Sequence, residues 1–168
     1  MPGESAENPI ERPTSRILLL DERDRALMFT VRQPDRETGK PFWFPPGGGL
    51  EPGETHEDAA HRELLEETGL QCELGPCIWV RTPHVWYFQP TELWYSSAER
   101  YFLARVDHPA ITTDRWTELE IQDISRYYWW SLDEMRESDD LFVPRGLREL
   151  LPPILAGHIP AEPLAIAI

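Results

Sequence analysis

The most informative segment of this chain is GGGLEPGETHEDAAHRELLEETGL, residues 47–70. It places seven carboxylates in a glycine-rich loop and one short amphipathic segment. Thr55 is a good N-cap residue, and Asp58 follows three residues later, as in a capping box. Gly69 suits the left-handed conformation that ends many helices. We therefore predict a helix over residues 56–68.

Three glutamates of this helix, Glu63, Glu66 and Glu67, stand at i, i+3 and i+4 and therefore share one face. Like charges at that spacing cost roughly 0.2–0.5 kcal/mol per pair, and the helix dipole disfavours anions near the C-terminus. Clustered carboxylate oxygens are the ligands that Mg²⁺ or Mn²⁺ prefers, and a bound cation removes the repulsion. The alternative is a solvated acidic face, which is the usual meaning of such a run.

The pattern around the helix resembles the signature of the Nudix hydrolases. That signature reads glycine, five residues, glutamate, seven residues, Arg-Glu, an aliphatic residue, any residue, Glu-Glu, any residue, glycine and an aliphatic residue, and this chain fills every fixed position. The residues in those positions are Gly48, Glu54, Arg62, Glu63, Leu64, Glu66, Glu67, Gly69 and Leu70. The motif covers about a seventh of the chain, so it indicates the reaction type more strongly than the substrate.

The resemblance implies a nucleotide diphosphatase that uses Mg²⁺ or Mn²⁺ to hydrolyse a diphosphate linkage in a nucleoside diphosphate derivative. It implies that Glu63, Glu66 and Glu67 bind the metal and that one of them is the general base. The carbonyl of Gly48 is implied as a further ligand. Water must approach a phosphorus shielded by anionic oxygens, which explains why the chemistry needs metal ions. The number of ions and the identity of the base stay open.

Two further residues of the motif, Glu54 and Arg62, are expected to hold the loop against the helix, because arginine makes bidentate contacts with carboxylates. A phosphate contact or a plain surface charge is the alternative for Arg62. Many Nudix enzymes take an additional carboxylate from the loop before the last strand, and Glu118 and Glu120 are the candidates here. The sequence does not distinguish between them. For each residue the alternative interpretation is an ordinary solvated charge on the loop.

Aromatic residues outside the motif are candidates for stacking on the base or sugar of the substrate. Trp43 and Phe44 lead directly into the glycine loop, and Trp86 begins an aromatic strand segment. Stacking on an aromatic face suits any base. Core packing is the alternative for each of them.

Two other functions remain to be weighed. A non-catalytic binding module on a Nudix fold is expected to lose one or more metal glutamates, and none is missing from the motif. An isopentenyl diphosphate isomerase shares the fold, but no catalytic cysteine and glutamate pair is evident in its usual setting. Hydrolysis therefore remains the favoured reaction.

Composition restricts the partners and the compartment. Sixteen basic and thirty acidic residues give a net charge of −14, which opposes binding to nucleic acid polymers and anionic membranes.

Cys72 and Cys77 alone indicate neither a disulfide framework nor a zinc site. No signal peptide or apolar run of about 18 residues is evident, so we expect a cytoplasmic protein. Its expected partner is a small-molecule nucleoside diphosphate derivative, with a homodimer as an open alternative.

The order of apolar, polar and turn-forming segments predicts the fold class. Strands are expected at residues 16–20, 26–32, 42–44, 77–82, 85–89, 99–106 and 127–130, with a turn at Pro83, a connection through Trp94 and Tyr95, and an acidic loop over residues 107–123. Further helices are expected after Ser131 and over residues 144–151. We predict an α/β/α sandwich with a mixed β-sheet between helices. Residues 14–155 would form the single domain, after a mobile lead-in, 1–13, and before a proline-containing tail, 156–168.

Overall fold

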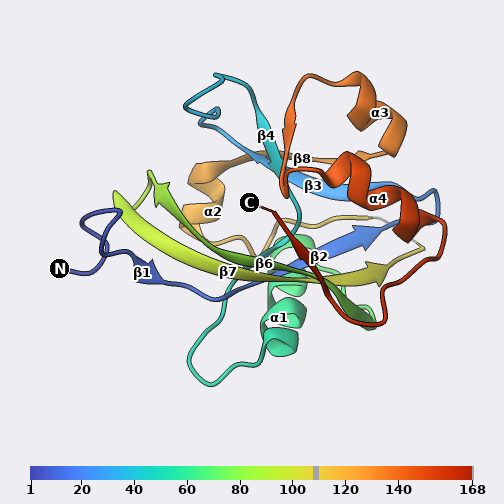
Figure 1. Ribbon diagram of the computed structural model, residues 1–168, viewed down its shortest axis with the longest axis horizontal. Helices are drawn as coiled ribbons and strands as arrows, with labels where there is room; N and C mark the ends of the chain where they lie inside the picture. The colour runs from blue at the N-terminus through green and yellow to red at the C-terminus, as the bar shows by residue number, and fades with distance from the viewer. Residues whose placement is uncertain (108–109, 168) are drawn as a thin grey trace.

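A mixed β-sheet with helices on both faces forms the centre of the protein, in a computed structural model that describes residues 1–107 and 110–167 (Figure 1). Its strands are β1 (Ile10–Glu11), β2 (Thr14–Leu20), β3 (Ala26–Val31), β4 (Phe42–Phe44), β5 (Gly47–Gly49), β6 (Leu74–Phe88), β7 (Leu93–Arg105), β8 (Ile124–Trp130), β9 (Leu141–Phe142) and β10 (Leu164–Ile166). Its helices are α1 (His56–Thr68), α2 (Glu118–Asp123), α3 (Leu132–Glu137) and α4 (Leu147–Leu155).

The side chains of β2 alternate between two hydrophobic cores, one on each face of the sheet. Ile17 and Leu19 pack in the core that includes α1 residues. Leu18 and Leu20 point the other way, into the core that includes residues of α3 and α4. All four are almost fully buried, so β2 lies at the centre of the fold. The two layers confirm the predicted α/β/α sandwich.

The sheet combines parallel and antiparallel pairs, as predicted. Its main path runs β10-β6-β7-β2-β3-β4-β9, with β1 against β7, β5 against β2 and β8 against β3. Strands β2 and β7 are parallel, whereas β6 and β7 form a long antiparallel hairpin. The glycine strand β5 is antiparallel to the start of β2, which brings the loop before α1 to the edge of the central strands.

The turn predicted at Pro83 is wrong, because β6 continues through it from Leu74 to Phe88. The pairing with β7 shifts register between Arg81 and His84, and this irregularity takes up the two residues in between. Proline has no N–H for a ladder hydrogen bond, so a bulge is one of the few places in a sheet that accept it. The connection predicted through Trp94 and Tyr95 is also wrong, since both residues lie in β7.

One helix was not predicted, and another differs from its predicted bounds. Part of the predicted acidic loop, residues 107–123, forms α2, which is started by a capping box between Thr117 and Glu120, while residues 108–109 lie outside the described structure. The last helix was expected to stop before Pro152, because proline disfavours helix interiors. In the structure α4 continues to Leu155 with Pro152 and Pro153 inside it.

The chain on either side of residues 14–155 also contributes strands to the sheet. Residues 10–11 form β1, which is parallel to β7. Residues 164–166 form β10, which is parallel to β6. Both segments are therefore placed by backbone hydrogen bonds to the long β6–β7 hairpin.

Candidate metal-binding and catalytic site

Helix α1 presents the glutamates and begins and ends where the sequence predicted. The Thr55 side chain accepts a hydrogen bond from Asp58 N, the Asp58 side chain accepts one from Thr55 N, and Gly69 ends the helix in the left-handed region with φ 73°. Ser15 of β2 donates a 2.7 Å hydrogen bond to the carbonyl of His56. This contact fixes the first turn of the helix to the central strand.

Three carboxylates, from Glu63, Glu67 and Glu120, converge at the other end of α1. One oxygen of each lies within 4.8 Å of those of the other two. Glu63 and Glu67 are buried, with 8% and 4% of their surface exposed. Burial raises the pKa of Glu67 well above its ordinary value, and the nearby Glu63 raises it further. Oxygen ligands gathered at this distance suit a hard divalent cation, which would compensate the buried negative charge.

Arg62 joins the loop to the helix through four partners. Its guanidinium forms a bidentate pair with Glu54, at 2.6 and 2.9 Å, and donates to the carbonyl of Gly49 at 3.0 Å. It also contacts Glu63 at 2.9 Å and Glu66 at 3.2 Å. The hydrogen bond from Arg62 holds the pKa of Glu54 at about 2. These contacts keep Glu54 ionised and hold the glycine strand beside the helix.

Glu66, expected as a metal ligand, lies next to the carboxylate cluster and outside it. The oxygens that converge belong to Glu63, Glu67 and Glu120. Of the two carboxylates that the sequence left open in the later loop, the structure brings Glu120 to the cluster, from α2. Glu118, at the first position of the same helix, is exposed to solvent.

The strand β5 requires glycine where it passes between β2 and α1. Gly47 has φ 143°, and a Cβ there would overlap the carbonyl of Ser15. A Cβ on Gly48 would overlap the carboxylate of Glu63. The glycines therefore let the backbone approach the helix closely enough for its own polar groups to meet the glutamates.

Among the aromatic candidates, Trp43 is corrected by the structure. It is 1% exposed, packs edge-on against Trp130 at 5.2 Å and donates from Nε1 to Asp140 at 2.8 Å. This side chain therefore belongs to the core and has no free face for a ligand. Phe44 and Trp86 are half-buried and keep part of their surface open.

Residues that sequence reasoning missed support the cluster from the loop before α2 and from the strands β2 and β7. Trp116 donates from Nε1 to the carbonyl of Glu67 at 2.8 Å. Arg16 donates to the carbonyl of Gly47 at 3.3 Å and to Glu99 at 3.2 Å. A charged residue inside each of the apolar strands β2 and β7 was a usable signal, because buried charges are found in pairs.

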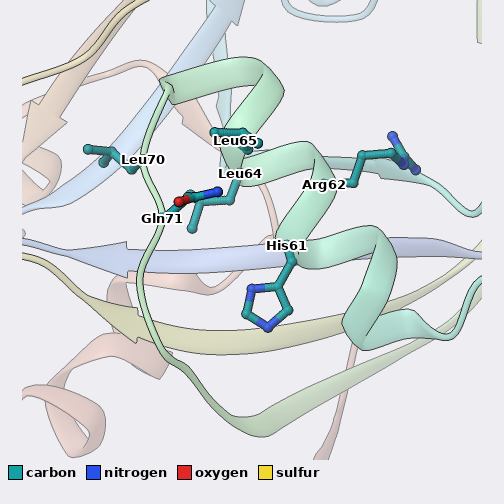
Figure 2. Close-up of a pocket in the computed structure, with 6 residues that line it drawn as sticks. All are labelled: His61, Arg62, Leu64, Leu65, Leu70 and Gln71. Atoms are coloured by element: carbon teal, nitrogen blue, oxygen red, sulfur yellow. The ribbon is translucent and has the colours of Figure 1, made fainter.

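A separate surface pocket of 350 Å³ lies beside α1 and is lined by His61, Arg62, Leu64, Leu65, Leu70 and Gln71. Figure 2 shows the Arg62 side chain extending away from Leu70 and Gln71. None of these lining residues is a carboxylate, and the Arg62 head group is engaged by glutamates. The pocket is therefore distinct from the carboxylate cluster.

A family model described as the NUDIX domain matches residues 11–151, which is most of the chain. The chain belongs to the NUDIX family. The match includes the glycine strand, α1 and α2, so all the residues of the carboxylate cluster lie inside the NUDIX domain.

Curated relatives of this NUDIX protein match part of their own length. An RNA pyrophosphohydrolase from Erythrobacter litoralis is 34% identical over 111 residues, covering 61% of this chain and 65% of that protein. A putative 8-oxo-dGTP diphosphatase from Bacillus subtilis is 41% identical over 64 residues, covering 38% and 39%. The matched segment is thus less than two thirds of either relative.

The NUDIX fold also recurs in solved structures. The MutT protein from Methanosarcina mazei superposes with a TM-score of 0.57 at 20% identity, covering 88% of this chain and 95% of that one. This likeness concerns the fold. Within the described residues, no helix combines the length and the apolar character that crossing a membrane requires.

Proposed function

We propose that this NUDIX protein hydrolyses a diphosphate linkage in a small nucleoside diphosphate derivative, with Mg²⁺ or Mn²⁺ as its cofactor. The supporting observation is the convergence of Glu63, Glu67 and Glu120 within 4.8 Å. Two of these carboxylates are buried, which is unfavourable unless a positive charge accompanies them.

The residues fit a hard divalent cation. Carboxylate and carbonyl oxygens are its preferred ligands, and Glu63, Glu67 and Glu120 would hold it, with Glu66 and the carbonyl of Gly48 beside them. When bound, such a cation neutralises phosphate charge and lowers the pKa of a coordinated water. The relatives named above act, by their names, on RNA pyrophosphate groups and on 8-oxo-dGTP, which agrees with a diphosphate linkage in the substrate.

The chain itself supplies orientation and proton transfer. The N–H of Gly47 holds one oxygen of Glu67 at 2.9 Å, which leaves the other oxygen for the metal or for the attacking water. Arg62 holds Glu63 and Glu66 from one side. One of the three motif glutamates of α1, Glu63, Glu66 or Glu67, takes the proton from the attacking water, because a positioned carboxylate serves as a general base.

A substrate panel with metal tests the proposal. Nucleoside triphosphates, oxidised nucleotides, ADP-ribose, dinucleoside polyphosphates and nucleotide sugars would be assayed with Mg²⁺ and Mn²⁺ and again after chelation. Glu67→Gln should lower kcat/KM on the best substrate by at least ~100-fold, whereas Glu57→Gln, at an exposed position of the same helix, should not. Binding of a nucleotide without turnover would favour the non-catalytic module instead.

A further inference from the structure

Three arginines contact the glycine strand β5, and they differ in the carboxylates that pair with their positive charge. Arg62 is paired with Glu54, Glu63 and Glu66. Arg16 is paired with Glu99. Arg12 has neither a carboxylate within ion-pair distance nor a hydrogen bond from its guanidinium within residues 1–107 and 110–167. Among the three arginines at β5, Arg12 is therefore the one without a carboxylate partner in the described part of the chain.

The position of Arg12 is nevertheless fixed by its surroundings. Its backbone N–H donates to the carbonyl of Ser96 at 2.8 Å, and its own carbonyl accepts from Thr14 at 2.9 Å. The side chain lies across Gly49, where a Cβ would stand 2.5 Å from Nε. The guanidinium is 5.6 Å from the centre of the Tyr95 ring. It is therefore held between β5 and the β6–β7 hairpin.

The electrostatic environment of Arg12 favours an added anion. Desolvation, followed by the like charge of Arg16, lowers the pKa of Arg12, while Glu63 acts in the opposite direction. A half-buried cation without a counter-ion loses hydration and gains little in return. An anion that reached the guanidinium would meet several unused N–H donors.

Strand β5 places Arg12 next to the carboxylate cluster. Gly48 faces the carboxylate of Glu63, and the neighbouring Gly49 faces Arg12 on the other side of the strand. Tyr95, beneath the guanidinium, stacks on Trp86 at 5.2 Å with an interplanar angle of 28°. Pairwise contacts thus link the cluster, through strand β5 and Arg12, to the rings of Tyr95 and Trp86.

We propose that Arg12 binds a phosphate group of the substrate beyond the carboxylate cluster, with the ring of Tyr95 supporting its guanidinium. A guanidinium binds phosphate oxygens through two parallel N–H donors, and an aromatic face holds it in a fixed orientation. This inference rests on the proposed function, since it concerns the same substrate. It adds a binding residue outside the signature motif.

The test compares Arg12→Ala with Arg105→Ala, a β7 arginine whose partner is Asp24 at the surface. Binding of inorganic pyrophosphate in the presence of Mg²⁺ would be measured by calorimetry. Arg12→Ala should weaken it about 10- to 100-fold, and Arg12→Lys by less, because lysine keeps the charge and loses the paired donors. Arg105→Ala should bind as the wild type does.

A second variant and a second readout separate a binding role from a structural one. Gly49→Ala keeps the charge and displaces the Arg12 side chain, so it should also weaken pyrophosphate binding. On the best panel substrate, Arg12→Ala should raise KM by a similar factor while kcat changes little. Pyrophosphate affinity within about twofold of wild type in Arg12→Ala, or no pyrophosphate binding by the wild type, overturns the inference. Absence of hydrolysis with Arg12-dependent pyrophosphate binding would instead reject the proposed function alone.

Discussion

The backbone N–H of Gly47 donates a buried hydrogen bond of 2.9 Å to Oε2 of Glu67. The carbonyl of the same glycine accepts from Arg16, which in turn is paired with Glu99 of β7. One residue of the glycine strand thus connects a buried ion pair in the sheet to a glutamate on α1. The orientation of that glutamate depends on residues far outside the signature motif.

Gly48→Ala is expected to abolish most activity while leaving the protein folded. Its backbone does not occupy the left-handed region, so alanine is conformationally acceptable, but the new Cβ would overlap the carboxylate of Glu63. That carboxylate is the flexible end of a side chain and can move, which would take it out of the cluster at little cost in stability. We expect kcat/KM to fall by at least ~100-fold with a small change in melting temperature.

Gly39→Ala is the matched control for this substitution. Gly39 has φ 69°, and among the described residues no atom beyond its two chain neighbours lies within 4 Å of the added Cβ, so the change introduces only backbone strain, about 1 kcal/mol. It should lower the melting temperature slightly and leave kcat/KM unaltered. Equal activity losses in the two alanine variants would mean that Gly48 acts through stability rather than through Glu63.

Glu99→Gln is expected to destabilise the fold strongly. Glu99 is 3% exposed and contacts Arg16 at 3.2 Å, Arg81 at 3.1 Å and the hydroxyl of Tyr101 at 2.6 Å. Removing one member of a buried ion pair leaves the others uncompensated, which costs about 3–5 kcal/mol. Urea unfolding should show this loss, whereas Asp24→Asn, in the exposed pair with Arg105, should cost ~0–1 kcal/mol.

The same residue predicts part of the acid sensitivity of the protein. The positive charge of Arg16 and the hydrogen bond from Tyr101 outweigh desolvation and lower the pKa of Glu99 from 4.5 to about 2. A group whose pKa is lower in the folded state stabilises the protein above its unfolded pKa and loses that contribution as the pH falls. The free energy of unfolding should therefore decrease more steeply for wild type than for Glu99→Gln between pH 4.5 and about 2. Parallel curves for the two proteins would contradict the assignment.

A divalent cation is expected to raise the melting temperature, because it binds the folded carboxylate cluster and has no equivalent site in the unfolded chain. Millimolar Mg²⁺ or Mn²⁺ should produce a shift that Glu120→Gln reduces and Glu118→Gln preserves. The two glutamates lie on the same short helix, but only Glu120 reaches Glu63 and Glu67. Equal shifts in both variants would remove Glu120 from the proposed metal site.

The first and last residues of α1 were predicted correctly because they depend on capping residues that are close in sequence. Its start and stop depend on Thr55, Asp58 and Gly69, whose effects act within one helical turn. The long strands β6 and β7 were missed in part because Pro83 and the polar stretch before Trp94 resemble turns when the partner strand is unknown. The pairing of β6 with β7 is decided by tertiary structure, which overrides local propensity.

The site residues also separate into those that local sequence predicts and those that depend on tertiary structure. The motif placed Glu63 and Glu67 because their spacing along one helix determines which face they share. It left Glu118 and Glu120 unresolved, since the choice depends on how α2 is capped and where it docks. Arg12 was assigned to the mobile lead-in, because its surroundings on β5 and β7 are distant in sequence.

The two tryptophans that were candidates for base stacking should now behave differently on replacement by alanine. Trp86 is half-buried, donates to Ser97 at 2.9 Å and stacks on Tyr95, whose ring centre lies 5.6 Å from the Arg12 guanidinium. Stacking of a base on an aromatic ring contributes ~1–3 kcal/mol, so Trp86→Ala should raise KM by roughly tenfold to a hundredfold. Because the contact is remote from the reacting phosphorus, kcat should stay nearly constant. Trp43→Ala should instead cost about 3–5 kcal/mol of stability by leaving a cavity in the core, measured by urea unfolding. An unchanged KM in Trp86→Ala, with normal folding, would assign base recognition to another surface.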